Sequence, residues 1–248
     1  MSPAQLTSPK PLHAARSRWF YPAMAVWAIL FSAAAFAPSM LSPAGRKGPL
    51  SSLLISHAIL FQLWLLLFLI QSLLATRKLS LHRTIGTASI ALAGGMALLG
   101  YAVTIAMGRR GFDLSGDIAA QQDPLAAMGF PLLDVVLFLS LFAAAYLFRR
   151  RPEIHKRLIL LTTFAALMPA PITHLTGHYA VLHGAIPFTP ILVAAFLFAG
   201  ALHDLVDRRR IHPVFLWIPL TIFIVENICF AKVFPAPAWH RFAAWLLR

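Results

Sequence analysis

The chain has 248 residues, of which 59% are hydrophobic and 12% are charged. Soluble domains have roughly 45–50% apolar and about 25% charged residues, so the composition excludes an ordinary soluble domain and a disordered chain. The single cysteine excludes an intrachain disulfide framework, and the net charge of +13 comes from short clusters between apolar runs. Such clusters are typical of membrane topology, and we expect no nucleic-acid partner.

Seven segments are long and apolar enough to cross a bilayer as helices, for which about 20 residues suffice. In chain order they cover residues 19–37, 51–75, 84–107, 129–148, 155 to between 168 and 175, 186–205, and 213–233. They leave no room for a soluble domain. The sequence therefore predicts an all-α fold, a polytopic seven-helix bundle in the lipid bilayer, multi-pass in the cell (inner) membrane.

Lysine and arginine are unevenly divided between the two sides of this bundle, with fourteen on the side of the N-terminus and seven on the other. Cytoplasmic loops are enriched in these residues, so we expect the N-terminus inside, with residues 1–18 as a cytoplasmic tail and 19–233 as the transmembrane domain. An alternative for the first span is a cleavable signal peptide, because Arg16 and Arg18 precede it and residues 35–37 resemble a cleavage site.

Two segments on the outer side are not spans. The connection over residues 108–128 is long, which is typical of a lid or cover. Residues 234–248 predict an amphipathic helix at the membrane interface, because apolar side chains follow the i, i+3, i+4, i+7 spacing at Trp239, Phe242, Ala243 and Leu246.

On the inner side, three loops end with an apolar residue and a histidine where the next helix starts: His82, His155 and His212. The partial positive charge of a helix N-terminus and the neighbouring basic residues disfavour imidazolium. We therefore expect neutral rings that can bind a metal or accept a hydrogen bond, or that simply anchor and cap the helices. Asp204 at the same depth could orient His203 or pair with the cluster at residues 208–210.

Near the outer side, four helices bring ionisable residues to one depth: His57, Asp134, His174, His178 and Glu226. Ionisable groups inside a membrane are costly, so each is a candidate functional residue. His174 and His178 have the i, i+4 spacing that places two imidazoles on one helical face, as metal sites do.

Two prolines complicate this histidine pair. Pro169 and Pro171 predict a kink or a helix end just before it, which would make residues 172–185 a loop or a broken segment lining a cavity.

The second span has a stripe that is polar at both ends and aromatic between them, at His57, Phe61, Trp64, Phe68, Gln71 and Ala75. The stripe is either ordinary core packing or one wall of a pocket for a flat apolar group, such as a haem or quinone ring.

These patterns favour a redox protein. A bis-histidine haem b could use His57 with His174 or His178, or two of the inner His82, His155 and His203, with Trp64 and Gln71 as further cofactor-binding residues. A transition metal ion (Fe, Cu or Zn) could instead be held by the five outer residues. A transporter or receptor-like bundle and a non-catalytic scaffold remain alternatives. Whether the protein is an enzyme stays open, because motifs such as GxSxG and HExxH are absent from the sequence.

Five motifs carry a family resemblance: His57-(x6)-Trp64-(x6)-Gln71, His82-Arg83-x-x-Gly86, Pro131-x-x-Asp134, Arg151-Pro-Glu-x-His155-Lys-Arg-Leu158 and His212-Pro-x-Phe-Leu-Trp217. Together they resemble a group of bacterial seven-span integral membrane proteins generally described as uncharacterised. The histidines at span starts are also similar to those of small membrane proteins of cytochrome oxidase maturation. The second likeness implies haem or copper handling and a respiratory complex or quinone as partner. The His174-x-x-x-His178 pair is not part of the pattern.

Overall fold

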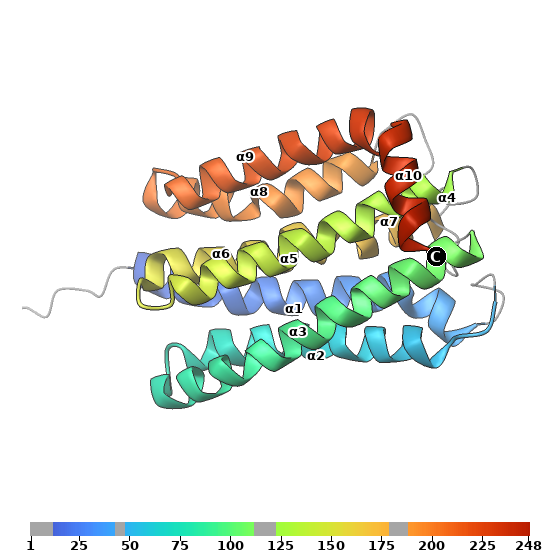
Figure 1. Cartoon of the computed structure of the whole chain (residues 1–248). Coiled ribbons are helices and arrows are strands. Elements are labelled where there is room, and N and C mark those ends of the chain that lie inside the picture. Colours follow the sequence, from blue (N-terminus) through green and yellow to red (C-terminus); the bar gives the residue numbers. More distant parts are fainter. Residues whose placement is uncertain (1–11, 43–47, 112–122, 179–187) are drawn as a thin grey trace, which may run out of the picture.

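The computed structural model describes residues 12–42, 48–111, 123–178 and 188–248, which form helices and no strands (Figure 1). In chain order the elements are α1 (Leu12–Leu41), α2 (Ser52–Leu74), α3 (Leu79–Arg110), α4 (Pro124–Ala127), α5 (Gly129–Leu147), α6 (Pro152–Ala166), α7 (Pro169–His178), α8 (Phe188–Arg208), α9 (Pro213–Ile228), the π-helical turn η4 (Cys229–Val233) and α10 (Pro237–Leu246).

The seven-span, all-α fold class is confirmed. Within the described ranges, seven stretches are long and apolar enough to cross a membrane, namely Trp19–Leu41, Ser52–Leu74, Leu79–Arg110, Pro124–Leu147, Pro152–Gly177, Phe188–Arg208 and Pro213–Val233. Large apolar side chains such as Leu30 (61% exposed) and Leu98 (72%) point outwards, which suits contact with lipid. The chain is therefore built as a multi-pass membrane protein.

Two helices are longer than the sequence predicts. The first begins at Leu12, seven residues before the expected start at Trp19. The third covers 32 residues, about 48 Å at 1.5 Å per residue, which exceeds a hydrocarbon core of about 30 Å. It ends where Gly111 adopts φ 76°, the left-handed conformation that commonly terminates helices. Residues 1–11, and residues 112–122 of the predicted long loop, lie outside the described residues.

The fifth span differs most from the prediction. The helix does break near Pro169, but only residues 167 and 168 interrupt it, and α7 then continues to His178. Of the two alternatives for residues 172–185, the loop is therefore wrong as far as His178, and the broken helical segment agrees with the structure there. Proline is tolerated in the first turn of a helix because its missing N–H has no partner there anyway, so Pro169 and Pro171 start a new helix. The rest of that loop, with His183, lies outside the described residues.

The core of the bundle is α6, which is buried on almost every side. It packs against α5, α8 and α9 (Figure 1), and side chains of α1 and α2 also contact it, at Tyr21 and Trp64. Between α8 and α9, Gly200 lets the two helices approach so closely that a Cβ at this position would overlap the ring of Phe215.

The turns between α2 and α3, α5 and α6, and α8 and α9 lie together at one end of the bundle (Figure 1, left). We call it the basic end because it holds eleven cations of the described residues: Arg77, Lys78, Arg83, Arg149, Arg150, Arg151, Lys156, Arg157, Arg208, Arg209 and Arg210. The other end, which we call the opposite end, carries α4, α7, η4 and α10.

At the opposite end, α10 lies across the bundle and is tied to the α4 segment. The Trp239 indole donates a hydrogen bond to the carbonyl of Leu125 (2.7 Å), and Ala243 is completely buried. Phe242 and Trp245 point outwards, at 46% and 61% exposure. The helix is thus amphipathic as expected, and its place at a membrane interface stays a prediction.

A second tie to α4 is electrostatic. His240 Nδ1 lies 3.0 Å from the Ala236 carbonyl, and its Nε2 lies 2.9 Å from Asp123 Oδ2. Both partners accept hydrogen bonds, so only imidazolium, which has two N–H groups, satisfies both. The Ala236 carbonyl and then the Asp123 carboxylate raise the pKa of His240. Hydrogen bonds from the Ala126 N–H and from His240 lower the pKa of Asp123.

Candidate functional site

A cavity of about 1330 Å³ opens at the basic end, between α1, α2 and α3 on one side and α5, α6 and α8 on the other. Ligand pockets usually measure about 300–1,000 Å³, so this cavity can hold a large cofactor. Its walls are mainly aromatic and aliphatic, with Tyr21, Trp64, Phe68, Phe142, Tyr146 and Ile159 among them.

The cavity follows from how α3 crosses the bundle. A Cβ at Gly95 would lie 3.1 Å from Leu60 of α2, and one at Gly100 would lie 3.1 Å from Val135 of α5. Gly95 thus lets α3 approach α2, and Gly100 lets it pack against α5 roughly 30 Å along the helix from its start. The α2–α3 and α5–α6 hairpins therefore meet closely towards the opposite end, and the space between them lies at the basic end (Figure 1).

Four of the five residues predicted to bind a cofactor line this one cavity: Trp64, Gln71, His82 and His155. The fifth, His57, is not part of its lining and lies nearer the other end of α2, where its ring faces Phe61 at 6.4 Å between centroids. The stripe on α2 is thus a cavity wall from Trp64 onwards only.

His82 and His155 occupy matching positions in two hairpins. His82 Nδ1 lies 3.2 Å from the carbonyl of Gln71, and His155 Nδ1 lies 2.9 Å from the carbonyl of Ala145. Because a carbonyl can only accept, Nδ1 of each ring carries the proton and donates it to the preceding helix. The same hydrogen bond, from the ring to the preceding helix, explains why the apolar-histidine motif is repeated at these two places. His212 departs from it, since its Nδ1 accepts from the N–H of Val214 and caps α9.

The two rings face the same space. Their centroids are 6.3 Å apart and their planes are nearly perpendicular, at 82°. Nε2 of neither ring has a hydrogen-bond partner among the described residues. Two ring nitrogens with lone pairs, on residues that line the cavity, therefore remain available to a ligand or to water.

Gln71 adds a polar group to the wall. Its amide nitrogen and oxygen are both buried and have no hydrogen-bond partner within the described part of the chain. An unpaired buried polar group costs about 1–3 kcal/mol, so a water or a ligand that bonds to this amide is expected. Trp64, in contrast, donates its indole N–H to Thr163 Oγ1 at 3.2 Å and is fixed edge-on against Phe138.

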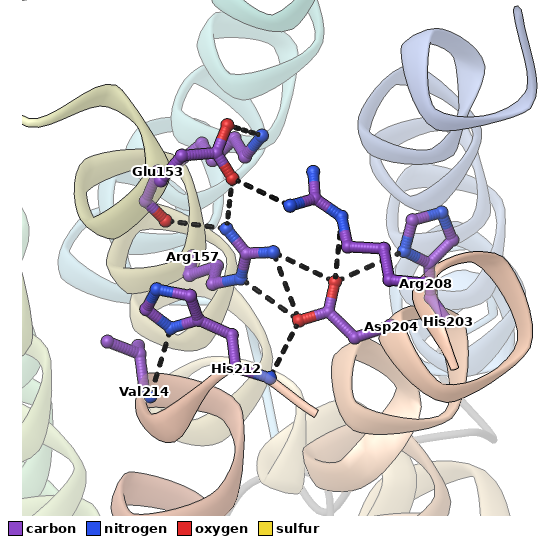
Figure 2. Close-up of polar contacts among 8 residues, drawn as sticks. Glu153, Arg157, His203, Asp204, Arg208, His212 and Val214 are labelled. Atoms are coloured by element: carbon purple, nitrogen blue, oxygen red, sulfur yellow. Dashed lines mark hydrogen bonds and ion pairs between the residues drawn. The ribbon is translucent and has the colours of Figure 1, made fainter. Parts of the chain in front are cut away.

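Beside the cavity lies a buried ion-pair network (Figure 2). Arg157 is 1% exposed, and its Nη2 donates to Asp204 Oδ1 and Oδ2 at 2.9 and 3.0 Å, while its Nε donates to Oδ2 at 3.2 Å. Arg157 Nη1 also bonds to a carboxylate oxygen of Glu153 at 2.7 Å. Asp204, equally buried, accepts from the backbone N–H of His212. The network therefore joins α6, α8 and the start of α9.

Sequence reasoning did not find Arg157 in this role, because it was counted among the cations that set topology. The signal was present: Arg157 begins the i, i+3, i+4, i+7 stripe that continues with Leu160, Leu161 and Phe164, all of which are buried. Asp204 was expected to serve His203 or the cluster at residues 208–210. The pairing with the cluster is present as a long ion pair, because Arg208 Nε lies 3.8 Å from Asp204 Oδ1. His203 Nδ1 lies at the same 3.8 Å, beyond hydrogen-bond distance.

The residues predicted near the outer side are only partly brought together. Asp134 of α5 and Glu226 of α9 lie close enough for their charges to interact. His174 is buried at 1% exposure and stacks on Phe36 of α1 at 4.6 Å. His178 ends α7, and its side chain is outside the description. In the parts of the chain that the structure describes, no three His, Cys, Asp or Glu side chains are grouped to hold a metal ion.

Comparison of the chain with models of protein families, with curated protein sequences and with solved structures finds no match. Fold and site together define a seven-span membrane protein with an aromatic-walled cavity at its basic end. The functional assignment therefore depends on the chemistry of that cavity.

Proposed function

We propose that the protein binds a b-type haem in this cavity, and that His82 and His155 would hold its iron. The observation that carries the proposal is the 6.3 Å between the two ring centroids. Two imidazoles on opposite sides of one metal ion, each with its nitrogen about 2 Å from the metal, have centroids roughly 6 Å apart. Little movement is needed to admit an iron between them.

The hydrogen bonds of Nδ1 support the same assignment. Histidines that bind metals usually donate their other ring N–H to a backbone carbonyl or carboxylate, which fixes the tautomer and leaves Nε2 for the metal. His82 and His155 each have this bond, to Gln71 and Ala145. The aromatic walls suit the flat face of a macrocycle, and their low polarity would help to set its reduction potential.

The bound haem would supply one-electron chemistry, so we propose a role in electron transfer or in maturation of an oxidase, with a respiratory complex as partner. Cytoplasmic faces of membrane proteins are enriched in Lys and Arg, which supports a cytoplasmic basic end, an N-terminus inside and a location in the cell (inner) membrane. This role agrees with the likeness of the span-start histidines to oxidase-maturation proteins.

Gln71 favours a quinone as the second candidate. Its buried amide has a free donor and a free acceptor in the described structure, and a quinone carbonyl could accept from the amide nitrogen while the ring lies against Trp64 or Phe68. A quinone gives no Soret band, so absorption spectroscopy separates the two candidates.

The test is titration of the purified protein with haem in a mild detergent. The unmodified protein should bind haem stoichiometrically with a six-coordinate, low-spin spectrum. His82→Ala and His155→Ala should each lose this spectrum or the haem, and added imidazole should restore the low-spin bands if the fold is intact.

His57→Ala is the matched control, because His57 lies on α2 but outside the cavity lining. It should bind as the unmodified protein does. Unchanged spectra in both cavity variants would refute the assignment. Loss of haem in the His57 variant alone would also refute it and would move the site to the opposite end.

A further inference from the structure

The cavity has a strong excess of positive charge. Five cations are in its lining, Arg83, Arg149, Arg150, Lys156 and Arg208, against a single acidic residue, Asp207. Two of the five are already compensated, because Glu153 lies 2.6 Å from Lys156 Nζ and 3.2 Å from Arg208 Nη1. The other three, Arg83, Arg149 and Arg150, are exposed, and we call the part of the lining that they form the mouth of the cavity.

These three arginines have no carboxylate partner among the described residues. Arg149 Nη1 bonds to the carbonyl of Tyr146 (3.0 Å), and its guanidinium lies 4.3 Å from the centre of that ring. Arg83 and Arg150 have no ion pair in the described structure. Guanidinium groups have five donors arranged to bind carboxylate or phosphate, and here most of those donors remain available.

The chain has few acidic residues with which to balance these arginines. It has eight acidic residues, and at the basic end only Glu153, Asp204 and Asp207 occur, while residues 1–18 contain none. Glu153 and Asp204 are taken by Arg157 and its neighbours. Of the other described acids, Asp134 and Glu226 lie within spans and Asp123 lies towards the opposite end.

We infer that the ligand of this cavity carries a carboxylate or phosphate group, which Arg83, Arg149 and Arg150 hold at the mouth while its apolar body lies between the aromatic walls. The inference rests on the proposed haem site and deepens it, since the propionate carboxylates of haem are one source of such a group. The phosphate of an anionic lipid is the other source.

The competing explanation is that these arginines only set topology, as cations at the ends of spans often do. In that case removing any three cations from the basic end would have the same effect on ligand binding. The comparison must therefore include cations at the same end of the bundle but outside the cavity lining, and Arg77, Lys78 and Arg210 meet this condition.

The experiment measures Kd for two matched probe pairs in neutral detergent. The first pair is haem and haem dimethyl ester, which lacks the free carboxylates. The second is a pyrene-labelled lysophosphatidic acid and the uncharged monoacylglycerol with the same chain. Each probe is tested with the unmodified protein, with Arg83→Gln/Arg149→Gln/Arg150→Gln, and with the control Arg77→Gln/Lys78→Gln/Arg210→Gln.

We expect the unmodified and control proteins to bind haem roughly tenfold or more tightly than its ester, because a hydrogen bond to a charged group contributes about 1.5–3 kcal/mol. The mouth variant should bind the two about equally. Comparing variants cancels any difference in solubility between the probes.

The outcomes separate the two proposals. If haem and ester bind equally well to the unmodified protein, the anionic mouth is refuted and the haem site stands. If neither binds but the lysophosphatidic acid is preferred and the mouth variant loses that preference, the mouth stands, with a lipid phosphate as its ligand, and the haem site falls. If no probe binds, or both triple variants lose the preference equally, the inference is overturned.

Discussion

Breaking the buried Arg157–Asp204 pair should destabilise the bundle strongly. Both side chains are 1% exposed and share three hydrogen bonds, so Asp204→Leu would leave a guanidinium almost without water in the interior. Removal of one partner from a buried ion pair typically costs about 3–5 kcal/mol. Arg157 would keep Glu153, which is 51% exposed, so we expect the lower part of this range.

The assay is unfolding by SDS in mixed micelles, followed by circular dichroism. Arg157→Met alone should also destabilise. Arg157→Met/Asp204→Leu should cost clearly less than the sum of the single variants, because the double variant leaves neither the buried guanidinium nor the buried carboxylate without its partner. Lys156→Met is the control, since it breaks a half-exposed pair that should contribute about 0–1 kcal/mol. Single variants at Arg157 or Asp204 that lie within about 1 kcal/mol of the unmodified protein would refute the reasoning.

Two further predictions concern helix packing and pH. Gly200→Ala should lower the free energy of unfolding by about 1–3 kcal/mol in the same assay, because its methyl group overlaps Phe215, whereas Gly94→Ala, which meets nothing within 4 Å, should leave it unchanged or raise it. Hydrogen exchange in α10, corrected for intrinsic rates, should be slower at pH 5.5 than at pH 8.5, and His240→Gln should remove the difference. Because the folded state raises the pKa of His240, its bonds stabilise the tie between α10 and α4 fully below about pH 6.5, and this stabilisation is lost as pH rises through the folded-state pKa. Because the folded state lowers the pKa of Asp123, that residue stabilises the tie above about pH 3.9, and its contribution is lost as pH falls through its own folded-state pKa. Exchange that is equal at both pH values would show that the tie to α4 does not titrate.

Composition and apolar length were enough to predict seven spans, because lipid imposes one physical requirement on each of them separately. Part of the cavity was also predictable. His82 and His155 follow turns at the same membrane depth, and the α2 stripe indicated which face of that helix carries Trp64 and Gln71.

The sequence could not show which helices meet. The Arg157–Asp204 pair joins residues 47 positions apart, and the placement of α3 depends on close approach at Gly95 and Gly100, which no local pattern encodes. The prediction grouped His57 and His174 with Asp134 only because they lie at the same depth in the membrane. Depth does not fix the direction in which a side chain points around its helix.

The most direct test of the haem site is the absorption spectrum of the unmodified protein, purified in mild detergent from cells with ample haem. The account predicts a Soret band, sharp α and β bands after reduction with dithionite, and stoichiometric haem by the pyridine haemochrome assay. A pure, folded protein that is colourless and remains so after haem is added would contradict it.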